Sequence, residues 1–111
     1  MKIGIDVGGT NLAAGAVDNN GQIVHSASTP ALPENGYASM VDSMAALADE
    51  LAAWVKENAP EDPVTEIGCG IPGIISRDGA TVVNAPNIFW KNEPLQKDLS
   101  DKTGLPVYLA N

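Results

Sequence analysis

The stretch that decides the fold is Lys2-Ile3-Gly4-Ile5-Asp6-Val7-Gly8-Gly9-Thr10-Asn11, close to the amino terminus. Its apolar residues Ile3, Ile5 and Val7 alternate with other residue types, which is the period of a β-strand that buries one face. Asp6 brings a carboxylate to the end of this strand, where burial is costly unless a cation or hydrogen-bond donors are present. The stretch therefore predicts a strand whose end faces a ligand.

A pair of glycines, Gly8 and Gly9, follows this strand. Glycine permits positive φ angles, and the pair lacks the Cβ atoms that would keep a ligand away from the backbone. Thr10 and Asn11 add short polar side chains before a second apolar run begins. This order predicts a turn whose N–H groups face phosphate oxygens, with Asp6 placed to hold a hydrated Mg²⁺. An ordinary Gly-Gly hairpin with a capping aspartate is the alternative that so short a motif leaves open.

Two other nucleotide-binding motifs are not expected. The first turn lacks the Gly-Lys-Ser/Thr of a P-loop, and a strand rather than a helix is predicted after it. The segment Gly68-Cys69-Gly70-Ile71-Pro72-Gly73 matches the dinucleotide pattern G-x-G-x-x-G. Those glycines must open a helix, whereas here the pair Pro72 and Gly73 leads into a second predicted hairpin.

The composition indicates a globular domain with few basic residues. The chain has 111 residues, 44% of them hydrophobic, which is enough for one domain with a buried core. The formal net charge of −8, from 14 acidic and 6 basic residues, argues against nucleic acid or an anionic membrane as the main partner. Cys69 is the only cysteine and no signal peptide is recognised, so we expect a cytoplasmic protein.

Hydrophobic periodicity predicts the remaining elements. Apolar residues recur at helical spacing from Tyr37 to Asn58, as in a helix that packs on a sheet. Residues 67–71 show no strong period and are expected to form a strand buried on both faces. A second helix is expected over residues 94–102, with Asn92 as its N-cap. Other strands are predicted at residues 12–17, 23–28, 74–75, 81–83 and 107–109.

Four segments, taken in order, resemble the N-terminal half of a ROK-family sugar kinase, and within that family the glucokinases. They are residues 3–11 (IGIDVGGTN), 68–74 (GCGIPGI), 83–90 (VNAPNIFW) and 104–111 (GLPVYLAN). The resemblance implies an α/β, ribonuclease-H-like domain of the actin-type ATPase class, with a five-stranded mixed sheet and helices on its faces. It also implies that residues 1–111 are the N-terminal domain of a longer kinase and lack its C-terminal domain.

The resemblance assigns the cofactors ATP and Mg²⁺ to the first turn. Gly8, Gly9, Thr10 and Asn11 would lie against the ATP phosphates, and Asp6 would bind Mg²⁺ through water. Many relatives have a lysine where this chain has Asn11.

The resemblance assigns the sugar to later segments. Gly73 would lie against the sugar, where a Cβ atom would intrude, and Asn87 and Asn111 would each hydrogen-bond a sugar hydroxyl. Residue type alone favours plain turn chemistry for Asn87, which follows Pro86. The family's catalytic base, an aspartate, is expected directly after Asn111, so no residue present is assigned as catalytic.

These assignments predict the N-terminal half of an ATP-dependent hexose kinase that phosphorylates a sugar 6-hydroxyl by in-line transfer, with the isolated chain inactive. Two alternatives belong to other classes. A fragment of a sugar-sensing ROK-type repressor is disfavoured by the acidic charge and by the absence of a DNA-binding segment before the first strand. An actin-like ATPase without sugar chemistry is disfavoured by the second and third segments. Glucose, fructose, N-acetylglucosamine and N-acetylmannosamine all stay open as substrates.

Self-association is also expected. In a longer kinase, elements after residue 111 would cover part of the sheet, and a soluble domain rarely leaves a large apolar patch in water. The isolated chain should therefore form a homo-oligomer, most simply a two-fold dimer.

Overall fold

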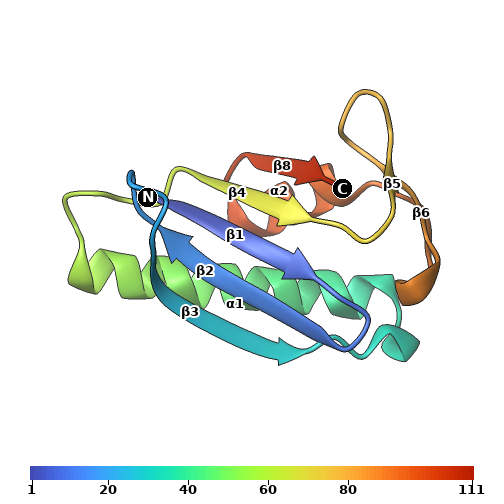
Figure 1. The fold of residues 1–111 in the computed structure, drawn as a ribbon, viewed down its shortest axis with the longest axis horizontal. Coiled ribbons are helices and arrows are strands. Elements are labelled where there is room, and N and C mark those ends of the chain that lie inside the picture. Colours follow the sequence, from blue (N-terminus) through green and yellow to red (C-terminus); the bar gives the residue numbers. More distant parts are fainter.

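The computed structural model describes residues 1–111 and contains a five-stranded mixed sheet with the order β3-β2-β1-β4-β8 (Figure 1). Strands β1 (Lys2–Val7), β2 (Asn11–Val17) and β3 (Ile23–Pro30) form an antiparallel meander. Strands β4 (Glu66–Gly70) and β8 (Val107–Ala110) then continue the sheet on the other side of β1, parallel to it and to each other. The predicted sheet is confirmed.

A second, three-stranded antiparallel sheet has the order β5-β6-β7. It consists of β5 (Ile74–Ile75), β6 (Val82–Ala85) and β7 (Trp90–Glu93), and the one-turn 3₁₀ helix η2 (Pro86–Ile88) joins β6 to β7. The β5–β6 hairpin was predicted from the sequence, but β7 was not, because Lys91, Asn92 and Glu93 show no apolar alternation. This small sheet lies beyond the carboxyl end of β4, next to the edge of the larger sheet where β1 and β4 end (Figure 1).

Two helices pack on one face of the large sheet. Helix α1 (Tyr37–Asn58) has the predicted bounds, and α2 (Leu95–Thr103) is close to the predicted range. Both helices share one core with β1 and therefore cover the same face of the sheet (Figure 1). Neither helix combines the length and apolar character needed to cross a membrane. The residues that α1 buries are Met40, Val41, Met44, Ala45, Leu47, Ala48, Leu51 and Val55.

The opposite face of the large sheet has small residues at its centre. Gly15, Gly4 and Gly68 lie side by side across β2, β1 and β4. In β4, Ile67 and Cys69 are buried towards the helices, while Gly68 is exposed. The prediction that residues 67–71 are buried on both faces is therefore wrong. The period was hidden because glycine takes the outward positions, and glycine is neither clearly apolar nor polar.

The predicted cap of α2 is also wrong. Asn92 lies in β7 with a positive φ of 53°, a conformation that asparagine tolerates better than most residues. Helix α2 begins after Pro94, and no side chain caps it. Pairing of β7 with β6 thus takes Asn92 away from the helix start.

Candidate nucleotide and sugar site

The carboxyl ends of the parallel strands β1, β4 and β8 meet at one edge of the large sheet. Asp6 pairs in register with Gly70, and Gly70 pairs with Ala110. In open α/β sheets, ligands bind outside the carboxyl ends of such strands. The end of β1 with its following turn, the turn after β4 and the last residue, Asn111, therefore all lie where a ligand is expected.

Residues 8–11 form a tight turn between β1 and β2. The Gly8 N–H donates to the Asn11 carbonyl oxygen at 3.0 Å, and the Ala31 N–H donates to the Thr10 carbonyl oxygen at 2.9 Å. The backbone N–H groups of Gly9 and Thr10 donate to no protein acceptor, and both residues are exposed. Two adjacent unpaired N–H groups are the donors that a phosphate group requires.

The turn does not use the positive φ angles that glycine permits. Neither Gly8 nor Gly9 has a positive φ angle. Glycine at position 8 is explained by crowding instead, because a Cβ atom there would lie 3.1 Å from the Asn11 carbonyl oxygen. At Gly9 a Cβ atom would make an ordinary contact of 3.6 Å with the Asn87 carbonyl oxygen. Positive φ occurs at Gly21, Gly36, Gly79 and Gly104.

The contact between Gly9 and Asn87 joins the two halves of the predicted site. It brings the turn assigned to phosphate against the η2 segment assigned to the sugar, although the two are far apart in the sequence. The η2 turn is closed by its backbone, since the Phe89 N–H donates to the Pro86 carbonyl oxygen at 3.2 Å and no side chain caps it. The Asn87 side chain is exposed, so it is available to a ligand rather than used to cap the turn.

The remaining two predicted sugar residues also meet. The Asn111 side-chain amide Nδ2 donates to the Gly73 carbonyl oxygen. One strand position earlier, the Ile71 N–H donates to the Ala110 carbonyl oxygen at 2.8 Å. The turn after β4 is thereby tied to the end of β8.

Gly73 has a different physical explanation from the predicted one. A Cβ atom at Gly73 would overlap the carbonyl oxygen of Asn84 and lie 2.8 Å from the Cβ atom of Ala85. The protein's own backbone therefore excludes a side chain at this position, with no sugar present. The sequence carried no signal for this contact, because the partner residues lie on a different strand.

Asp6 offers one carboxylate at the place where Mg²⁺ is expected. The side chain is exposed and extends beside Gly70, whose added Cβ would lie 3.9 Å from Asp6 Oδ1. No group of three or more His, Cys, Asp or Glu side chains gathers around a common point. Magnesium is commonly held by one or two carboxylates together with waters and substrate phosphates, and a lone carboxylate beside free N–H groups fits that mode.

A polar cluster that the sequence did not reveal lies beneath the small sheet. The Tyr37 hydroxyl donates to Asp98 Oδ2 at 2.8 Å, and its ring meets Trp90 edge-on at 5.0 Å. Burial, followed by the hydrogen bond and charge of Asp98, raises the pKa of Tyr37; burial and the Asp98 charge also raise the pKa of Glu93. Since 61 positions separate Tyr37 from Asp98, no local pattern could have indicated the pair.

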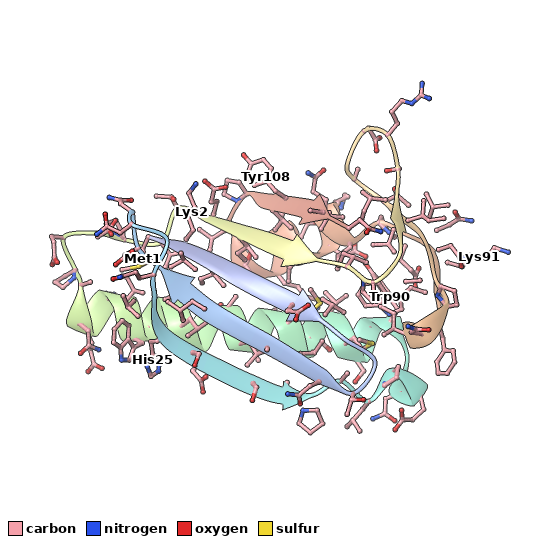
Figure 2. The ribbon with its side chains drawn as sticks, in the orientation of Figure 1. Met1, Lys2, His25, Trp90, Lys91 and Tyr108 are labelled. Carbon is pink, nitrogen blue, oxygen red and sulfur yellow. The ribbon has the colours of Figure 1, made fainter.

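Two other residues with reactive side chains lie away from the site. Cys69 is buried in β4, and burial raises the pKa of its thiol to about 12. His25 is half-buried and stacks on Trp54, with ring centroids 4.6 Å apart. Figure 2 shows His25 and Trp90 at opposite ends of the molecule. Trp54 therefore covers one side of the His25 ring.

Comparison with known proteins agrees with this geometry. A glucokinase from Streptomyces coelicolor is 36% identical over 100% of this chain and 32% of its own length. The structure of a ROK family glucokinase from Streptomyces griseus in complex with glucose and AMPPNP has a TM-score of 0.86 and 34% identity, covering 99% of this chain and 32% of that one. A xylose repressor from Caldicellulosiruptor bescii is 44% identical over 57 residues, which are 50% of this chain and 14% of that protein.

These matches settle the fold and the family. The chain spans about a third of the length of the curated glucokinases that it matches. Its α/β structure is the ribonuclease-H-like, actin-type ATPase fold that the sequence predicted. The family model described as "ROK family" matches residues 2–111, and the chain belongs to the ROK family.

Proposed function

We propose that this chain is the N-terminal part of an ATP-dependent hexose kinase of the glucokinase type. The observation that carries the proposal is the contact of Gly9 with Asn87, which places unpaired backbone N–H groups next to an exposed amide side chain. A kinase needs such neighbouring sites, because the sugar hydroxyl and the γ-phosphate must approach each other directly. The similar Streptomyces griseus glucokinase was crystallised with both glucose and AMPPNP, which supports this pairing of ligands.

Each predicted residue has a role in this proposal. The N–H groups of Gly9 and Thr10 bind ATP phosphates, with Gly8 closing the turn and Asn11 at its end. Asp6 holds Mg²⁺ through water, and the metal, when bound, neutralises charge on the phosphates. Asn87 and Asn111 hydrogen-bond sugar hydroxyls. Gly73 borders the sugar.

The general base that accepts the proton of the sugar 6-hydroxyl is not among these residues, and the longer kinase supplies it. The reaction transfers the γ-phosphoryl group to that hydroxyl oxygen as the bond to the ADP leaving group breaks. We place this kinase in the cytoplasm, where ATP is available and a lone cysteine stays reduced.

The proposal is tested in a chimaera in which this chain replaces the matching N-terminal third of a ROK glucokinase. ATP-dependent phosphorylation of glucose is expected in a coupled assay, and none is expected from the 111-residue chain. Asp6→Asn should lower kcat by about 10²-fold or more, while calorimetric glucose binding without nucleotide stays unchanged. Failure of the protein to phosphorylate any hexose would overturn the proposal. Loss of sugar affinity with normal turnover in Asp6→Asn would show that Asp6 contacts the sugar and not the Mg²⁺–phosphate group.

The similarity to a xylose repressor supports a second candidate, a sugar-sensing ROK regulator. We favour the kinase because the glucokinase match extends over 100% of this chain, compared with 50% for the repressor. The acidic net charge of −8 also opposes contact of this domain with DNA. Sugar-dependent DNA binding without phosphorylation, measured on the longer protein, would reverse the preference.

We also propose that the isolated chain forms a two-fold dimer through the sheet face that no helix covers. Gly4, Gly68 and the exposed Ile23, which is 68% accessible, belong to this face. A shallow depression of about 510 Å³ lies over it, and a second copy would remove this surface from water. Light scattering over a concentration series should show the dimer mass; a monomer at high micromolar concentration would contradict it.

A further inference from the structure

The turn between β4 and β5 packs directly against the backbone of β6. A Cβ atom on Gly73 would overlap the Asn84 carbonyl oxygen and lie 2.9 Å from the Ala85 Cα atom. These are backbone atoms, which cannot rotate away as a long side chain can. Ala85 is fully buried, and β6 pairs on both sides with β5 and β7. The turn and β6 are therefore closely packed, so a shift of one is transmitted to the other.

The same turn is held from its other side by β8. The Asn111 Nδ2 group donates to the Gly73 carbonyl oxygen, and the Ala110 carbonyl oxygen accepts from the Ile71 N–H at 2.8 Å. The turn is thus fixed between the end of β8 and the backbone of β6.

From β6 the contact continues to the 8–11 turn. Helix η2 begins directly after Ala85 and contains Asn87. The carbonyl oxygen of Asn87 lies 3.6 Å from the position of a Cβ atom on Gly9. Asn87 is only two residues from the end of β6, so a displacement of β6 should also move Asn87. Asn87 in turn borders the 8–11 turn, which contains the unpaired N–H groups.

We propose that Gly73 and Asn111 are positioning residues, which lock the turn after β4 onto β6 and thereby set where Asn87 lies against the 8–11 turn. The structural coupling does not depend on the proposed kinase function. Only its role, the alignment of sugar and phosphate, rests on that proposal. A displacement of about 1 Å can cost about 10²-fold in rate when reacting groups must be aligned. A glycine and an amide outside the reacting atoms then control the reaction geometry.

The test uses the 111-residue chain without sugar or nucleotide, so its outcome does not depend on the proposed activity. Backbone amide chemical shifts are measured by NMR for the wild type and for Gly73→Ala. We expect shift changes at Asn87 and at residues 8–11. The matched control is Gly68→Ala, because a Cβ atom there meets nothing within 4 Å, and its changes should stay on β4 and the adjoining strands.

A merely structural role for Gly73 would lower the melting temperature but leave the shifts of Asn87 and Gly9 unchanged in the folded state. Shift changes confined to the turn at residues 71–73, to β5 and to Asn84 and Ala85 would overturn the proposal. Should Gly73→Ala fail to fold, Asn111→Asp decides, since it removes the amide donor and keeps the glycine. Changes at Asn87 and residues 8–11 are then expected, and their absence refutes the proposal.

Discussion

Two glycine turns border the proposed site, and the protein leaves them very different amounts of room. At Gly73 a Cβ atom would overlap the backbone of β6, whereas at Gly9 it would make only an ordinary contact of 3.6 Å. Gly9 also has no positive φ angle that would require glycine. The protein alone therefore explains Gly73, whereas neither packing nor φ requires glycine at position 9, which agrees with the phosphate contact proposed there. A glycine in a conserved-looking motif is thus not by itself a sign of ligand contact.

The largest expected effect is on the free energy of unfolding, which should respond to a substitution in the Gly73 turn but not in the Gly9 turn. Gly73→Ala should lower the free energy of unfolding by about 2–3 kcal/mol, because overpacking against backbone forces a shift of β6. Urea denaturation of the 111-residue chain measures this loss. The control Gly68→Ala should stay within about 0.5 kcal/mol of the wild type. Equal losses in both variants would mean that the turn after β4 yields more easily than its contacts indicate.

The corresponding substitution in the Gly9 turn should affect nucleotide binding rather than stability. Gly9→Ala should change the free energy of unfolding by less than about 0.5 kcal/mol. It should weaken ATP binding in the longer kinase by about tenfold, or about 1.4 kcal/mol, because the Cβ atom keeps phosphate away from the backbone N–H groups. Calorimetric titration with a non-hydrolysable ATP analogue measures the affinity. Unchanged nucleotide affinity would remove the ligand explanation for Gly9 and with it the contrast between the turns.

Phe89 provides the opposite case, a position where the backbone favours glycine and the chain has none. Its φ is 63° and its side chain is 73% accessible. Phe89→Gly should raise the free energy of unfolding by about 0.5–1 kcal/mol, since strain relief of about 1–2 kcal/mol exceeds the entropy that glycine loses on folding.

The matched control for this position is Phe89→Ala, which keeps the Cβ atom and should give no gain. Thermal unfolding compares both variants with the wild type. A clear loss of stability in Phe89→Gly would show that the aromatic ring is packed in solution. Phe89 would then no longer be an example of a position where the backbone favours glycine.

The smallest effect on stability at neutral pH is expected from Cys69 in β4, the strand that precedes the Gly73 turn. The Cys69 thiol keeps its proton up to a pKa of about 12 when folded but titrates near 9.0 when unfolded. The stabilising contribution is complete below pH 9 and is lost as the pH rises towards 12, at up to about 1.4 kcal/mol per pH unit. Urea unfolding at several pH values should show a steeper loss of stability in the wild type than in Cys69→Ala, because Tyr37, whose pKa burial also raises, contributes equally to both. Equal slopes would show that β4 opens to solvent.

Helix α1 shows how much a local pattern can predict. Its bounds, Tyr37–Asn58, followed from the apolar spacing and from Pro60 after its end, because helical hydrogen bonds and an amphipathic stripe are set by residues within a few positions. The antiparallel strands β1, β2 and β3 could also be predicted, because strand alternation and tight turns likewise depend on residues close together in the chain. Strand β7 did not, because its residues are mostly polar and become a strand only by pairing with β6.

The site divides along the same line. The sequence by itself determined which residue types line the proposed site: an aspartate at a strand end, a glycine turn and exposed asparagines. It also determined, through its motifs, the family of the chain. Only the tertiary structure decided that Gly9 meets Asn87, that Asn111 holds Gly73 across 38 positions, and that β6 is the reason for the second glycine. Local propensity acts over a few residues, whereas such contacts arise only when strands distant in sequence are packed into one core.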